Sequence, residues 1–248
     1  MLIPPKDNQS IPCLIIKPEP ASYNEILKLQ KTLWSAVVAG NPKCRSALVV
    51  VEHNPVITMG TATLETSLPP DKKLLEDLGI ELVDIDRGGD ATYHGPGQIV
   101  AYPIVDVRKT AGDIHSFLRL LENAVIDTIA EYGLSGVRHG LAGVWVDNQK
   151  VCSIGIAVRK WVSYHGLALN VAPNLNHFSL IRPCGLDPTQ ITSMERLLGH
   201  SIDFDEVKEK LITHICRELG LEPIFTESAS SALSAYCSGP GSDNRQVA

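Results

Sequence analysis

One stretch near the middle of the chain constrains the fold more than any other. Residues 144–155 have the layout of two short strands joined by a polar turn, and a further strand at 164–171 follows the tip Arg159-Lys160-Trp161. Tight turns of this kind place consecutive strands antiparallel. The chain is therefore not a strict alternation of strands and crossover helices, and we expect an α+β fold with hairpins and flanking helices.

Helical patterns surround this antiparallel region. Ser22 and Glu25 have the spacing of a capping box that begins a helix of about four turns. Residues 113–132 carry one apolar face and end at Gly133, as an amphipathic helix does. We also expect helices at 72–78, 193–198 and 203–219, strands at 47–51, 81–85 and 98–107, a loop or strand edge at 53–60, and an edge or bulge at Pro103.

Length and composition indicate one domain. The 248 residues, 44% of them apolar, can bury a sizeable core. Residues 227–248 are rich in Ser, Gly and Ala with little apolar periodicity, which is typical of disorder. We therefore expect a single domain at 1–226 and a disordered tail at 227–248 that contains Cys237.

Several classes of protein are disfavoured. The net charge of −6 opposes a nucleic-acid partner, since phosphate backbones are bound by clustered Lys and Arg. No apolar run approaches a membrane span, and the first ten residues lack the pattern of a signal or transit peptide, so we expect a cytoplasmic protein. The six cysteines are scattered singly, which favours neither a metal site nor a disulfide scaffold. We expect no metal and no cofactor.

The most informative motif is a glycine-rich stretch at 87–98, which contains Arg87 and His94. Glycines let a backbone approach a ligand closely, although a tight turn between strands would use the same residues. The stretch lacks the spacing of nucleotide-binding loops. Arg87 could pair with an acidic core residue or with a ligand, and His94 could be a neutral core histidine or a proton shuttle.

Cys184 lies between Pro183 and Gly185, where little side-chain bulk would shield its sulfur. A thiol attacks as a thiolate, so a nucleophilic cysteine needs a nearby cation or helix N-terminus. The local sequence equally allows a small buried side chain in a turn. Lys150 begins the second strand of the hairpin, a position usual for exposed turn lysines. Cys152 is a rival nucleophile that more naturally packs in the core.

These stretches resemble the lipoyl(octanoyl) transferase family of lipoate biosynthesis. The resemblance covers about residues 47–194 and is strongest at 87–98, 143–155, 165–170 and 176–185. It implies a mixed sheet with a smaller sheet and flanking helices, similar to the catalytic domains of biotin and lipoate protein ligases. It assigns an acyl-thioester to Cys184 and the lowering of its pKa to Lys150. The substrate contacts it implies are Arg87, Gly88, Gly89, Asp90, Ala91, Thr92, Tyr93, His94, Ser153, Ile154, Gly155, Gly166, Leu167 and Ala168.

The reaction implied by this resemblance moves an octanoyl group from octanoyl-acyl carrier protein, through Cys184, to a lysine amine of a lipoyl domain. The acceptors would be 2-oxoacid dehydrogenase complexes and the glycine cleavage H protein. Both kinds of partner are acidic, and Arg159-Lys160, Lys72-Lys73 and Arg138 are candidate docking charges. Three alternatives stay open: an ATP-dependent lipoate or biotin ligase, a non-catalytic acyl-chain binding module, and a thiol hydrolase with His94 as the base.

Overall fold

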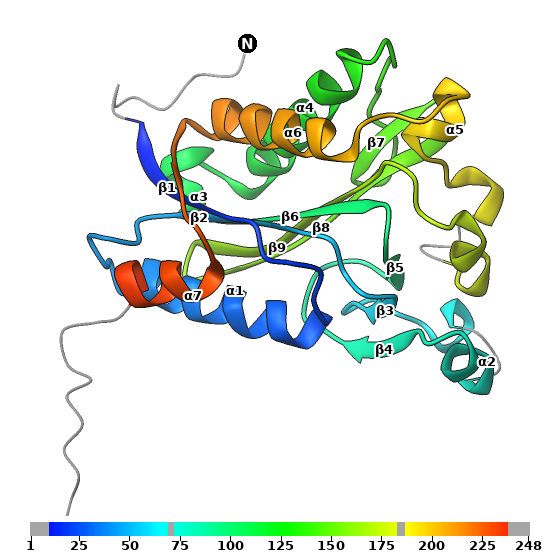
Figure 1. Cartoon of the computed structure of the whole chain (residues 1–248), viewed down its shortest axis with the longest axis horizontal. Helices are drawn as coiled ribbons and strands as arrows, with labels where there is room; N and C mark the ends of the chain where they lie inside the picture. The colour runs from blue at the N-terminus through cyan, green and yellow to red at the C-terminus, as the bar shows by residue number, and fades with distance from the viewer. Residues whose placement is uncertain (1–9, 69–71, 183–186, 238–248) are drawn as a thin grey trace, which may run out of the picture.

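The computed structural model describes residues 10–68, 72–182 and 187–237, and Figure 1 shows their arrangement. The strands are β1 (Ile11–Ile16), β2 (Ala47–Val51), β3 (Val56–Met59), β4 (Glu81–Asp84), β5 (Thr92–His94), β6 (Gln98–Ile104), β7 (Gly143–Val146), β8 (Gln149–Arg159), β9 (Val162–Asn170) and β10 (Leu221–Phe225). The helices are α1 (Tyr23–Val38), α2 (Lys72–Asp77), α3 (Val107–Thr110), α4 (Ile114–Ala130), α5 (Met194–Leu198), α6 (Phe204–Leu219) and α7 (Ala229–Ala232).

The strands form one large and one small sheet. The large sheet has the order β10-β1-β2-β6-β9-β8-β7, and the small sheet has the order β4-β3-β5. Pairing is antiparallel from β2 through β7, whereas β1 pairs in parallel with both β2 and β10. The expected mixture of hairpins, a smaller sheet and flanking helices is therefore present.

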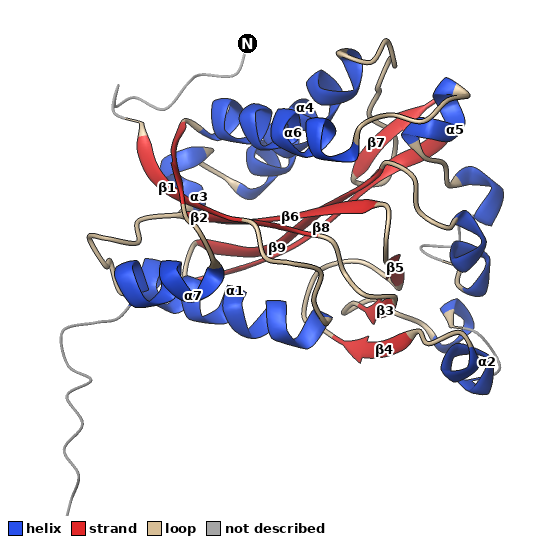
Figure 2. Cartoon of the chain, viewed as in Figure 1, coloured by secondary structure: helices blue, strands red, loops and turns tan. Residues whose placement is uncertain are grey.

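Helices cover both faces of the large sheet, so its central strands are buried on both sides. Helices α4 and α6 lie over one face, while α1 and α7 lie over the other (Figures 1 and 2). Along β2, Leu48 and Val50 belong to the core beneath α4 and α6, whereas Val49 and Val51 belong to the core beneath α1. This two-sided burial explains why the strand is an uninterrupted apolar run.

The local signals set the elements as expected. Ser22 and Glu25 form the capping box of α1, and Asp113 caps α4. Asp147 and Asn148 have positive φ in the turn between β7 and β8, and Lys160 and Trp161 have positive φ in the turn between β8 and β9. Two consecutive residues at positive φ are the turn that suits the twist of a hairpin.

Other features of the fold differ from the expectations. Pro103 lies in β6, an interior strand, but the ladder from β6 to β9 ends at Ala101, and the Ser163 hydroxyl donates to the Pro103 carbonyl at 2.7 Å. The proline therefore replaces an N–H where the ladder is already interrupted. The sequence carried no local signal that distinguished strands β1 and β10. Each belongs to the large sheet because it pairs with a strand beside it.

The tail also differs from the expectation of disorder from residue 227. Helix α7 begins with a capping box at Ser228, and Ala232 is fully buried against the α1 side of the core. The Asn41 side chain donates to the Tyr236 carbonyl at 3.0 Å. Small residues pack closely, so a segment rich in Ser and Ala can dock without strong apolar periodicity. Residues 238–248 lie outside the described part of the chain.

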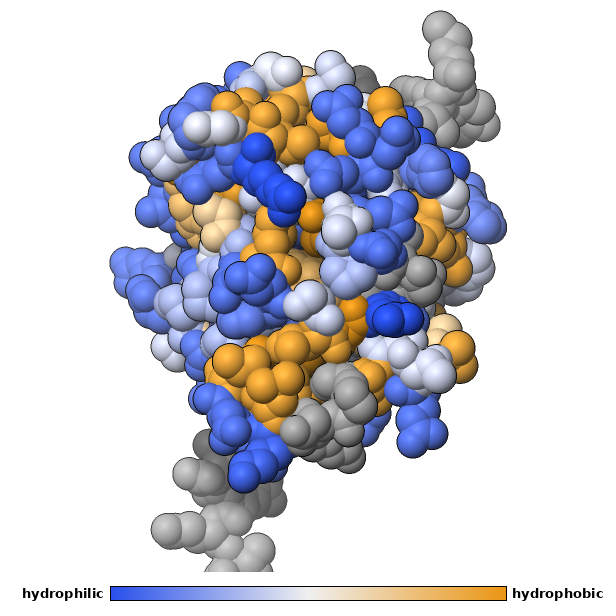
Figure 3. All heavy atoms as spheres, turned by 90° about the vertical axis from the view of Figure 1, so that its right-hand side faces the viewer, coloured by the Kyte–Doolittle hydropathy of each residue, from blue (hydrophilic) through white to orange (hydrophobic). Residues whose placement is uncertain are grey.

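None of the helices within the described residues is long and apolar enough to cross a membrane. Part of the surface on the side of the small sheet is nevertheless apolar. Leu64, Leu74 and Leu78 are exposed, and Figure 3 shows apolar side chains gathered on the lower part of that face.

Candidate active site

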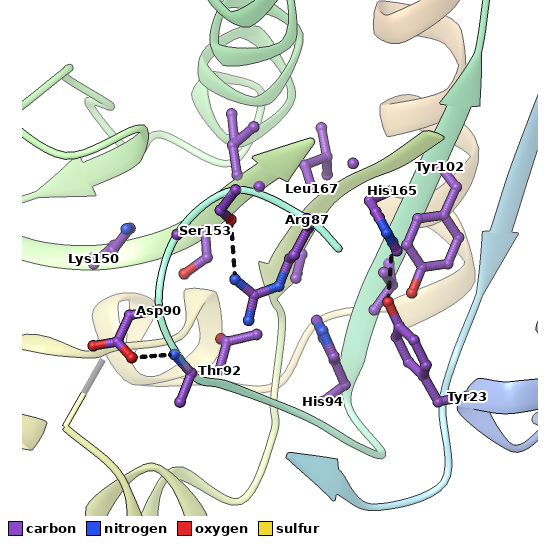
Figure 4. A pocket seen from close by; sticks show the side chains of 18 of the residues that line it. Tyr23, Arg87, Asp90, Thr92, His94, Tyr102, Lys150, Ser153, His165 and Leu167 are labelled. Atoms are coloured by element: carbon purple, nitrogen blue, oxygen red, sulfur yellow. Dashed lines mark hydrogen bonds between the residues drawn. The ribbon is translucent and has the colours of Figure 1, made fainter. Parts of the chain in front are cut away.

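A pocket lies where the loop after β4 crosses the large sheet. The loop rests on β8, because the Gly88 amide donates to the Ile156 carbonyl at 3.0 Å. Figure 4 shows residues of this loop, of β8 and of β9 around one space. The lining residues are Tyr23, Arg87, Gly88, Gly89, Asp90, Ala91, Thr92, His94, Val100, Tyr102, Lys150, Ser153, Ile154, Gly155, His165, Gly166, Leu167, Ala168, Phe178 and Ile191.

The structure brings together the residues expected to bind substrate, with one exception. Tyr93 does not line the pocket, because successive side chains of a strand point to opposite faces and Thr92 and His94 occupy the pocket face of β5. The Tyr93 hydroxyl instead lies 2.8 Å from Nδ1 of His177, and its ring packs edge-on against Phe178. Tyr93 supports the small sheet from behind.

Two glycines let the walls of the pocket come together. A Cβ atom on Gly166 would lie 2.0 Å from the Ala101 carbonyl oxygen, and one on Gly155 would lie 3.0 Å from both Cδ of Arg87 and the Gly88 carbonyl oxygen. Any side chain at Gly166 would force β9 away from β6. The glycines of these motifs therefore serve close backbone packing as well as access to the pocket.

Arg87 fastens the loop to the small sheet. Its Nη2 donates to the Thr58 carbonyl at 3.0 Å and to the Thr58 hydroxyl at 3.1 Å, and Nη1 donates to the Gly88 carbonyl at 3.1 Å. Asp90 lies on the same loop as Arg87, and its carboxylate accepts from the Ser67 hydroxyl at 2.7 Å. These contacts hold the pocket wall in place, and of the two interpretations of Arg87 they favour pairing within the protein, with Thr58 and the Gly88 carbonyl among its partners.

Lys150 is buried and lines the pocket, unlike an ordinary turn lysine; its side chain is only 7% exposed. Its Nζ lies 5.5 Å from the centre of the Trp145 ring, a contact that favours the charged ammonium. A Cβ atom on Gly143 would lie 2.7 Å from Cε of Lys150, so the glycine makes room for the lysine stem. The Lys150 carbonyl accepts from the Thr192 amide at 3.0 Å, which fixes its backbone.

Cys184 lies outside the described residues, so its distance from Lys150 stays a prediction. The chain on both sides of residues 183–186 is attached beside the pocket. The Arg182 amide donates to the Ser67 carbonyl at 3.1 Å, and Gln149 donates to the Thr189 carbonyl at 2.9 Å. Phe178 and Ile191, which precede and follow the segment, line the pocket.

Cys152 has the surroundings of a core residue. It is fully buried, and burial raises the pKa of its thiol to about 12 although Lys150 lies near enough to oppose the shift. A thiol of this kind is not ionised near neutral pH. Of the two cysteines considered from the sequence, Cys152 therefore lacks the electrostatics of a nucleophile.

Four rings lie at the pocket in contacts that the sequence did not indicate, and they belong to Tyr23, His94, Tyr102 and His165. The Tyr23 hydroxyl lies 3.1 Å from Nδ1 of His165, whose Nε2 lies 3.0 Å from the Asp86 carboxylate. The Tyr23 ring stacks on His94 with centroids 5.9 Å apart. The fourth ring, Tyr102, has its hydroxyl 2.7 Å from Nε2 of a histidine behind the pocket.

Burial favours the neutral form of the histidines at the pocket and of His53 behind it. Burial, together with the neighbouring His53, lowers the pKa of His94 to about 3, and burial lowers the pKa of His53 to about 4. Burial also lowers the pKa of His165 in spite of its bond to Asp86. Burial alone would raise the pKa of Asp86, but hydrogen bonds from Tyr164 and His165 hold it below its usual value. His94 thus fits a neutral wall residue better than a proton shuttle at neutral pH.

Comparison with known proteins places the chain in a family. A family model described as the lipoyl protein ligase A/B catalytic domain matches residues 22–216. The chain belongs to this family. An octanoyltransferase of Caldicellulosiruptor saccharolyticus is 42% identical over 205 residues, which cover 82% of this chain and 86% of that protein. An octanoyltransferase of Nitratidesulfovibrio vulgaris is 43% identical over 213 residues, covering 85% and 94%.

A solved member of the lipoyl protein ligase family has the same fold. The structure of a bipartite lipoate protein ligase from Thermoplasma acidophilum, from an archaeal lipoylation system, has a TM-score of 0.67 at 17% identity and covers 93% of this chain and 92% of that one. The expected likeness to lipoate ligase catalytic domains is therefore confirmed for the fold.

Membership of the lipoyl protein ligase A/B family does not by itself reveal the whole pocket. The sequence analysis missed Tyr23, Val100, Tyr102, Phe178 and Ile191 as lining residues, and it quoted His165 only as part of a motif. Each belongs to an ordinary helix, strand or loop pattern, so no local signal separated it from a core residue. Within the described residues, no group of three or more His, Cys, Asp or Glu side chains could hold a metal ion.

Proposed function

We propose that the chain transfers an octanoyl group to a lysine amine of a lipoyl-domain protein. The observation that carries the proposal is the buried side chain of Lys150 at a pocket lined by glycine-rich loops and apolar side chains. Relatives more than 40% identical over about four fifths of the chain are named octanoyltransferases, which supports the choice of acyl group.

In the first half-reaction, the Cys184 thiolate attacks the carbonyl carbon of an octanoyl thioester on acyl carrier protein. A new bond forms between that carbon and the Cys184 sulfur, and the old carbon–sulfur bond breaks, so the carrier leaves as a thiolate. In the second half-reaction, a lysine amine attacks the Cys184 thioester, the carbon–nitrogen bond forms and the cysteine leaves. The proton lost by the amine balances the thiolate that is released, and no ATP is consumed.

Lys150 would stabilise the anionic sulfur in both halves. At a separation of about 4 Å and an effective dielectric constant near 20, the attraction between ammonium and thiolate is about 4 kcal/mol before desolvation. Trp145, Gly143 and Thr192 restrict the lysine from three sides, through the ring contact, the cleared space and the backbone hydrogen bond. A charge held in place before the reaction needs no reorganisation during it.

The protein partners remain part of the proposal. Octanoyl-acyl carrier protein would be the donor, lipoyl domains of 2-oxoacid dehydrogenase complexes and the glycine cleavage H protein would be the acceptors, and the reaction would occur in the cytoplasm. Two of the candidate docking charges are engaged within the chain. Arg138 donates to Glu122 at 2.9 Å, and Arg159 pairs with Asp86 at 3.0 Å. Lys160, exposed at the hairpin tip, is a better candidate than either.

Intact mass spectrometry after mixing with octanoyl-acyl carrier protein tests the proposal. We expect a gain of one octanoyl group that hydroxylamine removes and that Cys184→Ala abolishes, while Cys152→Ala retains it. Adding a lipoyl domain should then discharge the acyl group without ATP. Product formed only from free octanoate and ATP would instead make the chain a ligase, and release of free octanoate would make it a hydrolase.

A further inference from the structure

The pocket has a second end, away from Lys150, that the proposed chemistry does not use. Figure 4 shows Lys150 on one side of Arg87 and Tyr23, Tyr102, His94 and His165 on the other. These four rings come from α1, β6, β5 and β9, and all are buried. Four polar rings from four elements are an unexpected lining for the place where an alkyl chain would end.

Tyr23 is held by a hydrogen-bonded chain that starts outside the pocket. The Asp86 carboxylate can only accept, so Nε2 of His165 donates to it, and Nδ1 of His165 is left to accept the Tyr23 hydroxyl proton. The His165 amide donates to the Gln30 side chain at 2.9 Å, and His165 itself has a φ of 57°. The His165 ring is bonded at both nitrogens and its backbone amide is held as well, in an uncommon backbone conformation, so it gives Tyr23 a fixed position.

His94 is held by a second chain that runs the other way. The Thr192 carbonyl accepts from the Asn170 amide group at 2.9 Å, so the Asn170 oxygen accepts from the Gln98 amide group at 2.8 Å. The Gln98 oxygen is then the acceptor for Nδ1 of His94 at 2.7 Å. Backbone carbonyls at Thr192 and Tyr93 fix both amide orientations, and with them the tautomer of His94.

The two hydrogen-bonded chains meet in the stacked pair of Tyr23 and His94. Their rings are 5.9 Å apart and inclined by 15°. Because these chains bind the Tyr23 hydroxyl and Nδ1 of His94, two polar rings can face an apolar occupant with little loss of hydrogen bonding. The walls of the same pocket also include the apolar side chains of Val100, Ile154 and Leu167.

We propose that the Tyr23–His94 pair is the end wall that limits the length of the acyl chain. The inference rests on the proposed octanoyl transfer, with the carboxyl end of the chain at Lys150. Each further methylene that could be buried would favour binding about fourfold. Displacing either ring would break a buried hydrogen bond, which costs about tenfold or more. Acyl chains longer than the space between Lys150 and the Tyr23–His94 pair are therefore disfavoured.

The test compares octanoyl, decanoyl and dodecanoyl carrier protein as donors and measures kcat/KM for each. In His94→Ala, removal of the ring should raise the ratio of decanoyl to octanoyl transfer about tenfold. Tyr23→Phe keeps the ring but frees it, and should raise the ratio less. Asp86→Asn, which acts from outside the pocket through His165, should change the ratio in the same direction. His200→Ala, at an exposed histidine, is the matched control and should leave the ratio unchanged.

An unchanged preference for octanoyl in both His94→Ala and Asp86→Asn, with transfer retained, would overturn the wall. If His94→Ala does not fold, Asp86→Asn and Tyr23→Phe decide. If the unaltered chain transfers no octanoyl group, the proposed reaction fails, and calorimetry with octyl and dodecyl thioethers of pantetheine still tests the wall. Equal affinity of the unaltered chain for the two thioethers would then reject it.

Discussion

The two ends of the pocket bury polar side chains in opposite ways. At one end, the ammonium of Lys150 lies over an aromatic face, and its position is set within one hairpin by Gly143 and Trp145. At the other end, Tyr23 and His94 are neutral and tied into hydrogen-bonded chains that cross several elements. On the proposed function, a cation would lie where an anion must be stabilised, and neutral, hydrogen-bonded rings would lie where an alkyl chain must stop. The same degree of burial would then serve chemistry at one end and selection at the other.

Replacing the charge should have the largest effect. In Lys150→Met, we expect octanoyl transfer to fall about a thousandfold, because the thiolate loses its stabilising cation. The measurement is the rate of acyl-enzyme formation, with Lys160→Met at the exposed hairpin tip as the control. A fall in rate with an unchanged pKa of the Cys184 thiol would contradict the electrostatic role and leave Lys150 a positioning residue.

The second-largest effect is expected when a side chain fills the space beside the aliphatic part of Lys150. In Gly143→Ala, the new Cβ would lie 2.2 Å from the Cys152 carbonyl oxygen, and φ is 137°. We expect a loss of about 3 kcal/mol in the free energy of unfolding, measured in urea, together with a loss of transfer. Gly133→Ala is matched for positive φ but meets no atom within 4 Å, so it should cost about 1 kcal/mol. Equal losses in the two variants would rule out the clash.

The neutral end predicts a pH dependence of stability. Burial depresses the pKa of His53 to about 4 and of His94 to about 3 in the folded state, against about 6.5 when unfolded. The unfolded state then binds more protons below pH 6.5, so stability falls as the pH falls toward 4. Between pH 6 and 5, each histidine should lower the free energy of unfolding by about 1 kcal/mol.

Urea denaturation at several pH values measures this slope. In the double variant His53→Gln/His94→Gln, the free energy of unfolding should depend on pH less steeply, by about 2 kcal/mol per pH unit between pH 6 and 5, whatever the variant's absolute stability. His115→Gln, at an exposed position, is the control. A slope that the double variant leaves unchanged would mean that these rings are not the groups that titrate.

The smallest effect is expected where the neutral end reaches solvent. Arg159 pairs with Asp86 at 3.0 Å, but its side chain is 66% exposed. In Arg159→Gln, the free energy of unfolding should change by less than about 1 kcal/mol. The preference for octanoyl should be unchanged, because Tyr164 and His165 still hold the carboxylate. A shift in chain length as large as that of Asp86→Asn would show that the wall depends on this exposed pair.

What the sequence revealed depends on how local each signal is. The capping box of α1, the strand β2 and the turn at Asp147-Asn148 are set by neighbouring residues, and all were predicted. Strand β1 pairs with β10, joining Ile11 to Leu221, and no local pattern reports such a pairing. The site follows the same rule. Its glycine loop was found from the sequence, whereas the contact of Tyr23 with His165 spans 142 positions and was not.

Lys150 also shows that a local sequence pattern does not report what surrounds a side chain in the fold. Its position at the start of a hairpin strand predicts an exposed side chain, and only the resemblance to a family assigned it a role. Burial comes from Trp145 and Gly143, which the turn brings beneath it. The burial of Lys150 is therefore decided less by its own identity than by the residues that pack around it.

Thr192 has a consequence for how the pocket keeps its dimensions. Its amide binds the Lys150 carbonyl, and its own carbonyl begins the chain of amides that ends on His94. One fully buried residue is thus the common reference for both ends. We therefore expect a displacement of Thr192 to carry the Lys150 backbone and the His94 ring with it, so that the distance between the two ends of the pocket changes little.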